Sequence, residues 1–207
     1  MNLLDPEITP MQPVLKSYWL MIHVAIITGS YAPLGISCIL SFLALILFGF
    51  RNKENATIMN ININELTFIS EIFMTVGLFM LTIGTFLGGV WANESWGRYW
   101  GWDPKETWAL VAVLVYAIIL HLRYIPGLKG KFTFNAVAFW GYTSILFTFF
   151  GVNFYLVGLH SYAQGDGLAE VPMWIKLTVL VFALFTAFVA YRNWNFKKKQ
   201  KKDDIEL

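Results

Sequence analysis

The longest uncharged stretch of the sequence runs from Ser17 to Phe50 and has no Asp, Glu, Lys or Arg at any of its 34 positions. A membrane-spanning helix needs about 20 mostly apolar residues, so this stretch is too long for one simple crossing. Pro33 weakens a helix, and the glycines of the Gly29–Gly35 segment loosen it. We therefore predict a break there, with the first span at Tyr31–Phe50 and the preceding apolar residues outside the bilayer core.

Four more apolar stretches are long enough to cross a membrane. The chain is 57% hydrophobic and 14% charged, whereas soluble domains carry about 25% charged residues. The sequence therefore predicts an all-α, polytopic membrane helix bundle of about five transmembrane helices, forming a single membrane domain over residues 1–207. The further predicted spans are Leu66–Val90, Thr107–Tyr124, Phe134–Leu159 and Val171–Tyr191.

Basic residues are distributed unevenly between the two sides of this predicted bundle. With the C-terminus inside, the inner segments hold 11 of the 15 Lys and Arg residues and the outer segments hold 4. Because basic loops stay in the cytoplasm, the N-terminus is predicted outside, and residues 195–207 form a charged cytoplasmic tail. The inner set is Arg51, Lys53, Arg123, Lys129, Lys131, Arg192, Lys197, Lys198, Lys199, Lys201 and Lys202, and the outer set is Lys16, Arg98, Lys105 and Lys176.

A tryptophan-rich stretch lies on the outer side between the second and third spans. The sequence ESWGRYWGWDPKETWAL, residues 94–110, holds four of the nine tryptophans and five charged residues. An interfacial aromatic belt accounts for the tryptophans, but it requires neither the interleaved glycines nor the acids and bases. Asp103 before Pro104, with Glu106 three residues on, predicts the capped start of a helix.

We call residues 91–108 the tryptophan segment and predict that it forms a flat apolar surface with polar edges. A planar ligand with anionic groups, such as haem, suits such a surface. Arg98 and Lys105 are both available to a haem propionate, and the sequence does not choose between them. The predicted cofactor-binding residues here are Trp96, Gly97, Arg98, Tyr99, Trp100, Gly101, Trp102, Asp103, Pro104, Lys105 and Glu106.

Histidines are the candidate axial ligands for such a haem. His23 lies about 12 Å outside the predicted first span if that segment is helical, and His160 follows the fourth span on the same side. Both therefore arrive at the level of the tryptophan segment. His121 lies about 22 Å from Glu106 along the third span, where it is either a ligand or a structural hydrogen-bonding residue.

Two other residues in the predicted spans, Glu71 and Cys38, allow a prediction. Glu71 on the second span lies at a depth similar to that of His121, and its carboxylate could accept the ring N–H of that histidine. Alternatively, Glu71 is protonated or reaches water at the inner surface. Cys38, the only cysteine, is interpreted as a small buried apolar residue, so no disulfide forms within the chain.

The stretch WGRYWGWDPKETWAL, residues 96–110, closely resembles the tryptophan-rich (WWD) signature of membrane haem-handling proteins in cytochrome c biogenesis. Its Trp-Asp-Pro-Lys-Glu-Thr form is similar to the CcsA (ResC) type subunit of the system II cytochrome c synthetase, more than to the related CcmC and CcmF branches. The similarity extends from about LKSYWLMIHV, which begins at Leu15, through the fifth span. The order and placement of the three histidines also match.

The resemblance implies a haem lyase (holocytochrome c synthase) in a bacterial cytoplasmic (inner) membrane, acting on the periplasmic side. It implies non-covalent haem b bound at an outer site by His23 and His160, and a membrane site with His121. Haem is delivered to the outer face and presented to apocytochrome c, whose CxxCH cysteines form thioethers with it. Thiol-reducing proteins keep these thiols reduced.

The resemblance also implies a membrane partner of the CcsB (ResB) type, which supplies a further histidine to the membrane site. Family members commonly have more spans before the first outer histidine, so we expect a core CcsA module whose upstream half comes from elsewhere. Membrane lipid is the other expected contact, and no nucleic-acid partner is expected. The alternatives are a CcmC-type haem exporter, an electron-transfer cytochrome b with two histidine ligands, and a structural subunit without haem.

Overall fold

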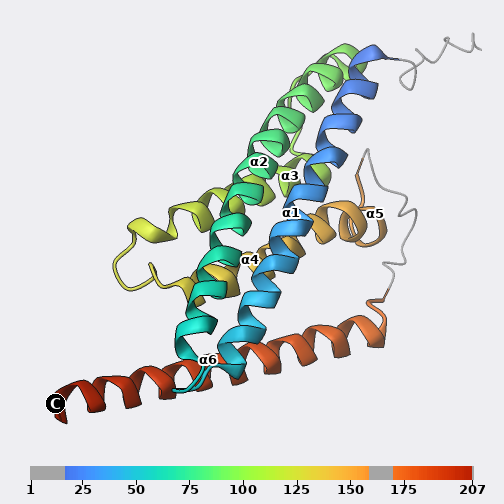
Figure 1. Ribbon diagram of the computed structural model, residues 1–207. Helices are drawn as coiled ribbons and strands as arrows, with labels where there is room; N and C mark the ends of the chain where they lie inside the picture. Colours follow the sequence, from blue (N-terminus) through green and yellow to red (C-terminus); the bar gives the residue numbers. More distant parts are fainter. Residues whose placement is uncertain (1–16, 159–169, 207) are drawn as a thin grey trace, which may run out of the picture.

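The computed structural model describes residues 17–158 and 170–206, which fold into a bundle of helices (Figure 1). Within this described part, five helical stretches are long and apolar enough to cross a membrane, which confirms the predicted all-α membrane bundle. The elements are α1 (Tyr18–Phe50), α2 (Ala56–Trp96), α3 (Pro104–His121), η2 (Leu122–Tyr124), α4 (Lys131–Leu146), η3 (Phe147–Gly151), α5 (Val152–Tyr155) and α6 (Met173–Glu206).

Helix α1 runs unbroken for 33 residues, so the predicted break at Gly29–Gly35 is wrong. Pro33 lies inside the helix, and its neighbours Ser30 and Leu34 are fully buried. In lipid, backbone groups must find partners within the protein, and packing against other helices allows a proline inside a spanning helix. At about 1.5 Å per residue α1 is about 50 Å long, which exceeds the roughly 30 Å bilayer core, so α1 tilts or projects beyond it.

Helices α1 and α2 lie side by side and antiparallel, and α2, with 41 residues, extends past both ends of the predicted Leu66–Val90 span (Figure 1). Glycines on α2 allow this close packing, because a side chain at their positions would overlap α1. The contacts pair Gly77 with the Leu34 side chain, Gly84 with the Ile27 Cα and Gly88 with the His23 ring, at 2.6, 3.0 and 2.7 Å from an ideal Cβ.

Buried hydroxyl groups also join these two helices. The Ser70 Oγ lies 2.9 Å from both the Ser37 Oγ and the Ser41 Oγ, and it donates to the Ser37 carbonyl oxygen at 3.1 Å. Such bonds satisfy hydroxyl groups that cannot form hydrogen bonds with water inside the bilayer. Cys38 is only partly buried, and its Sγ lies 3.6 Å from the Phe139 carbonyl oxygen on α4.

The remaining helices build on this pair. Fully buried residues of α1, α2, α3 and α4, including Leu34, Met74 and Tyr116, form the main core. Helix α4 continues into the π-helical turn η3 and then α5, which leads the chain back beside the start of α3. Helix α6 crosses the ends of α1 and α2 nearest their connecting turn (Figure 1), and among its described side chains only Val189 and Asn193 are buried. The helix continues through the predicted charged tail to Glu206.

Basic residues predicted on the inner side gather toward one end of α2. The Arg51 guanidinium donates to the Asn60 side-chain oxygen at 2.8 Å, and the Lys131 amine donates to the Asn64 side-chain oxygen. Arg98 lies in the turn at the opposite end of α2. The structure therefore separates these basic residues as the charge pattern predicts, and the direction of the bundle across the membrane stays a prediction.

Candidate functional site

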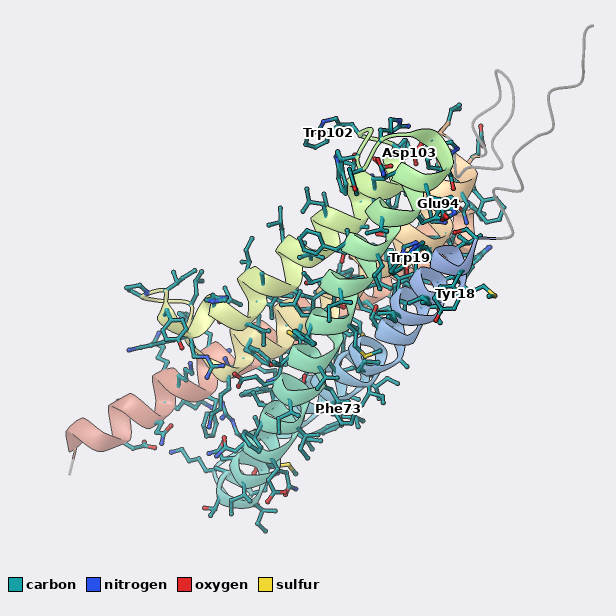
Figure 2. All side chains as sticks on the ribbon, turned by 90° about the horizontal axis from the view of Figure 1, so that it is seen from above. Tyr18, Trp19, Phe73, Glu94, Trp102 and Asp103 are labelled. Carbon is teal, nitrogen blue, oxygen red and sulfur yellow. The ribbon has the colours of Figure 1, made fainter. Side chains whose placement is uncertain are left out.

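The tryptophan segment comprises the last turn of α2, a connecting loop and the first turn of α3, and lies at the end of the bundle where α1 begins (Figure 2). Gly97 ends α2 with a left-handed backbone, φ 71°, and donates its N–H to the Asn93 carbonyl oxygen at 2.9 Å. Glycine adopts this conformation without steric cost, which is why it commonly terminates helices. The loop therefore leaves α2 at a fixed point.

Two carboxylates organise the loop and confirm the predicted start of α3. Asp103 caps α3 by accepting the Lys105 N–H at 3.1 Å, and Pro104 occupies the first turn. The Glu106 Oε2 accepts the N–H of Gly101 at 2.7 Å and that of Asp103 at 3.3 Å. This reciprocal arrangement is a capping box, extended by one more bond into the loop.

Arg98 folds back over the same loop. Its Nη1 lies 3.9 Å from the Glu106 Oε1, and its guanidinium stands 5.8 Å from the centre of the Trp96 ring. An ideal Cβ at Gly101 would lie 1.2 Å from that Nη1, so the absence of a side chain makes room for the guanidinium. The Arg98 side chain as a whole stays 37% exposed, although its Nη1 atom is buried.

The aromatic rings of the segment do not form the predicted flat surface. Trp100 and Trp102 meet edge to face at 5.8 Å with 89° between their planes, and Trp91 and Trp96 meet at 4.8 Å with 66°. Edge-to-face contact is favoured between aromatic rings, which explains why they tilt instead of lying in one plane. The tryptophan segment therefore presents the faces and edges of separate rings in different orientations instead of one plane.

Trp102 is the exposed tip of the loop. Figure 2 shows Trp102 at this end of the bundle. Its side chain is 71% exposed, and that of Tyr99 is 62% exposed. Trp102 has φ 58°, and among the described residues it is the only one besides glycine with a positive φ. A bulky residue in that region is strained, and such strain often accompanies a functional position.

His23 lies on α1 beneath this segment. Its Nδ1 is 2.7 Å from the Gly84 carbonyl oxygen on α2, and its ring is parallel to that of Trp91 at 6.5 Å. A carbonyl oxygen only accepts, so Nδ1 carries the proton, and in the neutral ring the lone pair is on Nε2. A histidine held in this way is oriented as metal-binding histidines are. His23 thus meets the level of the segment as predicted, but on a continuous helix.

His160 lies outside the described residues, so its pairing with His23 stays a prediction. Gly158, two residues earlier, packs against the segment, because an ideal Cβ there would lie 2.5 Å from the Asp103 Oδ1. Gly158 thus brings the end of the first described stretch of the chain beside the start of α3.

The π-helical turn η3 places α5 beside the start of α3. Thr148 donates to the Trp108 carbonyl oxygen at 3.1 Å, and the Lys105 amine donates to the Asn153 side-chain oxygen at 2.8 Å. π-helical turns are rare and frequently occur at functional sites. Lys105 is therefore engaged within the bundle, whereas Arg98 lies at its edge.

His121 ends α3 at the opposite side of the molecule and is exposed. Its Nδ1 lies 2.7 Å from the Ala117 carbonyl oxygen, so the same reasoning places the neutral lone pair on Nε2. The expected bond from His121 to Glu71 is wrong, because Glu71 forms an ion pair with Arg123. Glu71 and Arg123 both line a groove of about 340 Å³ between α2 and η2.

Sequence reasoning did not identify Gly84, Gly88 and Asn153 as parts of the site. The Gly84 carbonyl oxygen accepts the hydrogen bond from the His23 ring N–H, and Gly88 leaves space for the ring. Small residues four apart on a spanning helix mark close helix packing, and this spacing was the available signal. Asn153 offered no such signal, because its role depends on the turn at η3.

Comparison with known proteins places the chain in a family. Residues 3–160 match the family described as Cytochrome C assembly protein. Protein NrfI of Wolinella succinogenes is 53% identical over 165 residues, which cover 80% of this chain and 18% of NrfI. The cytochrome c biogenesis protein CcsA of Chlamydomonas reinhardtii is 45% identical over 156 residues, covering 75% of this chain and 44% of that CcsA.

CcsA of Prochlorococcus marinus is 42% identical over 177 residues, covering 72% of this chain and 55% of that protein. The chain thus spans about half the length of these CcsA relatives and a smaller part of NrfI. The family match covers α1 to α5, including the whole tryptophan segment. The chain therefore belongs to the cytochrome c assembly protein family and is a CcsA-type cytochrome c biogenesis protein.

Proposed function

We propose that this chain is the membrane subunit of a system II cytochrome c synthetase that holds haem b as its substrate at the tryptophan segment. In the proposal it works with a CcsB (ResB) type partner and presents haem to apocytochrome c for thioether formation. The observation that carries the proposal is the orientation of His23, whose Nδ1 bonds to Gly84 while its ring lies beside Trp91. A histidine oriented by a carbonyl oxygen in this way has the arrangement that is typical of histidines that bind metal ions.

The described residues suit a haem-sized planar substrate in further respects. Trp102 and Tyr99 expose large aromatic surface at the loop tip, where burial of a porphyrin face would remove apolar area from water. Arg98, 37% exposed, is the better placed partner for a propionate, because the Lys105 amine already bonds to Asn153. Bound haem would supply the vinyl groups that the two CxxCH cysteines attack.

The contribution of this chain is to position the substrate. The loop is fixed by Gly97 at one end, by the capping box of Asp103 and Glu106 at the other, and by α5 behind it. Holding reactants in a fixed geometry replaces an encounter of free molecules and accelerates their reaction strongly. In this proposal His160 is the second outer ligand, and His121 belongs to a separate membrane site completed by the partner.

The test is coexpression of the chain with a CcsB-type partner and an apocytochrome carrying CxxCH. Haem stain measures covalently attached haem, and absorption spectra measure haem in the membrane complex. We expect His23→Ala to lower cytochrome output about tenfold or more, with partial recovery when imidazole is added. Phe86→Ala is the matched control, because Phe86 lies on α2 between Gly84 and Gly88 and is 75% exposed.

The test also distinguishes a wrong ligand assignment from haem handover of the CcmC kind. Normal haem content and normal cytochrome output in His23→Ala would show that the ligand assignment is wrong. Bound haem without covalent attachment, in the unaltered chain with its partner present, would indicate handover of the CcmC kind. His121→Ala should change the spectrum of the membrane site while leaving the imidazole-dependent signal of the outer site.

A further inference from the structure

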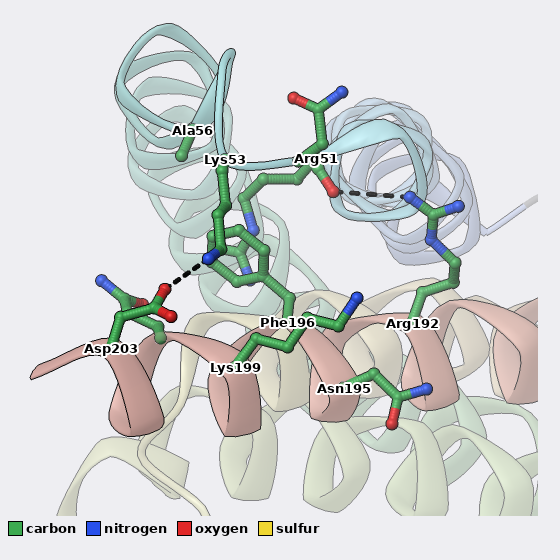
Figure 3. Close-up of a pocket in the computed structure, with 10 residues that line it drawn as sticks. Arg51, Lys53, Ala56, Arg192, Asn195, Phe196, Lys199 and Asp203 are labelled. Atoms are coloured by element: carbon green, nitrogen blue, oxygen red, sulfur yellow. Dashed lines mark hydrogen bonds and ion pairs between the residues drawn. The ribbon is translucent and has the colours of Figure 1, made fainter. Parts of the chain in front are cut away.

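A pocket of about 520 Å³ lies at the other end of the bundle, between α6 and the turn that joins α1 to α2 (Figure 3). Its volume falls in the range of small-ligand pockets, about 300–1,000 Å³. Four of the residues around it are cationic and one is acidic. The lining comprises Arg51, Asn52, Lys53, Ala56, Arg192, Asn195, Phe196, Lys199, Gln200 and Asp203.

Arg51 is the buried centre of this pocket, with 9% of its surface exposed. Its guanidinium donates to the side-chain oxygens of Asn60 at 2.8 Å and Asn193 at 2.7 Å, and it stands 4.2 Å from the centre of the Phe196 ring. Both hydrogen-bond partners are neutral amides. The Arg51 Nε has no hydrogen-bond partner among the residues that the structure describes.

The charge of Arg51 is therefore not balanced by a carboxylate within the described part of the chain. Loss of hydration lowers the pKa of the Arg51 guanidinium, but arginine remains protonated in proteins. The acidic residue of the lining, Asp203, pairs with Lys53 at 2.5 Å. Arg51, Arg192 and Lys199 thus leave the pocket with an excess of positive charge that an anion would balance.

The pocket lies where the apolar parts of two helices end. Arg51 directly follows the apolar helix α1, and Arg192 directly follows the apolar part of α6, which the sequence places at Val171–Tyr191. Tyr191 and Trp194 on α6 are 62% and 60% exposed. Exposed Tyr and Trp at the end of a spanning helix mark the level of the lipid headgroups.

The side chains converge on the pocket from both of its walls. Figure 3 shows Lys53 of the turn pointing toward α6, and Arg192 of α6 pointing toward the turn, where it donates to the Arg51 carbonyl oxygen at 3.5 Å. Arg192 and Lys199 are seven residues apart on α6 and therefore lie on one face of that helix. The basic groups surround a defined space and are not spread along the tail.

We propose that this pocket binds the phosphate group of an anionic phospholipid, which ties α6 to the turn between α1 and α2. The phosphate would accept hydrogen bonds from Arg192 and Lys199 and balance the charge of Arg51. Basic pockets between spanning helices are a recognised form of lipid headgroup site. The acyl chains would lie along α6, whose apolar side chains are largely exposed.

The test uses the full chain in nanodiscs that contain phosphatidylglycerol and phosphatidylcholine with identical acyl chains. Native mass spectrometry of the released protein measures the ratio of the two retained lipids. Arg192→Gln/Lys199→Gln removes two charges from the pocket, and the matched control Lys197→Gln/Lys198→Gln removes two charges from α6 outside the lining. We expect the preference for phosphatidylglycerol to be about tenfold lower in the pocket variant and less than about twofold lower in the control.

The outcomes separate this proposal from its alternatives. An equal loss of phosphatidylglycerol preference in both double variants would indicate diffuse attraction to the basic tail and would contradict the proposed site. No loss of this preference in either variant would contradict it as well. If inorganic phosphate displaces phosphatidylglycerol as well as added phosphatidylglycerol does, the ligand is a soluble phosphate, and the lipid assignment is wrong. Circular dichroism checks folding, and Lys199→Gln against Lys197→Gln repeats the comparison with single substitutions if the double variant unfolds.

Discussion

The two ends of the bundle both gather charged and aromatic side chains where helices stop, but they are organised by opposite charges. At the tryptophan segment, the Glu106 carboxylate accepts backbone N–H groups from Gly101 and Asp103 of one loop. At the pocket end, the Arg51 guanidinium donates to side-chain amides of two other helices, α2 and α6. The Glu106 carboxylate thus orders one local loop, whereas the long Arg51 side chain, with several N–H donors, joins distant segments.

This difference predicts where a single substitution does the most damage. The hydrogen bonds of Glu106 connect residues at most five positions apart, and closing such short loops costs little chain entropy. The bond from Arg51 to Asn193 connects residues 142 positions apart. We therefore expect the Arg51 contacts to hold the tertiary arrangement, and the Glu106 contacts to hold the geometry of one surface.

The largest expected effect is that of Arg51→Ala. It leaves the Asn60 and Asn193 oxygens without their donor and removes the cation from the Phe196 ring, at a cost of about 2–4 kcal/mol of unfolding free energy. Denaturation in mixed micelles measures this cost. Lys129→Ala, at an exposed basic residue, is the control and should change stability by less than about 0.5 kcal/mol. A cost for Arg51→Ala no larger than that of the control would refute the central role of Arg51.

A smaller effect is expected for Glu106→Ala. Loss of the capping box leaves two N–H groups without their acceptor and costs about 1–2 kcal/mol. Exposed Glu65→Ala on α2 is the matched control. Because the loop also loses its anchor for Arg98, cytochrome output in coexpression should fall more than the stability loss explains. Output that merely follows stability would argue against a shaped loop.

The smallest change in stability is expected for Gly101→Ala. The new Cβ meets the end of the flexible Arg98 side chain, which can move away, so the cost should stay below about 1 kcal/mol. A double-mutant cycle checks the cause: in an Arg98→Ala background the cost should largely disappear. Gly130→Ala is the control, since the nearest atom to its ideal Cβ is 3.7 Å away. A cost independent of Arg98 would place the strain in the loop backbone instead.

Features encoded by neighbouring residues were predictable from the sequence, and features set by helix rotation were not. The capped start of α3 at Asp103 was correctly predicted, because a cap depends on residues within one turn. The five spans followed from their apolar length. The partner of Glu71 was predicted wrongly, since depth along a helix does not reveal which face it presents.

Pro33 was also misjudged, and for a related physical reason. Its local preference is to end a helix, yet in lipid an opened helix would expose backbone groups to hydrocarbon. Burial of Ser30 and Leu34 on either side keeps α1 continuous. Tertiary and environmental terms outweigh local propensity there, and the same continuity carries His23 into the bundle.

The glycine contacts between α1 and α2 also limit how the length of these helices can change. In the three pairs Gly77 with Leu34, Gly84 with Ile27, and Gly88 with His23, the two residue numbers always add up to the same value. All three contacts therefore belong to one antiparallel register. A one-residue insertion or deletion between Gly77 and Gly88 would rotate the part of α2 that follows it by about 100°. The glycines before and after the change would then no longer lie on the same face of the helix. Natural length variation in this family should therefore be confined to the loops and helix ends.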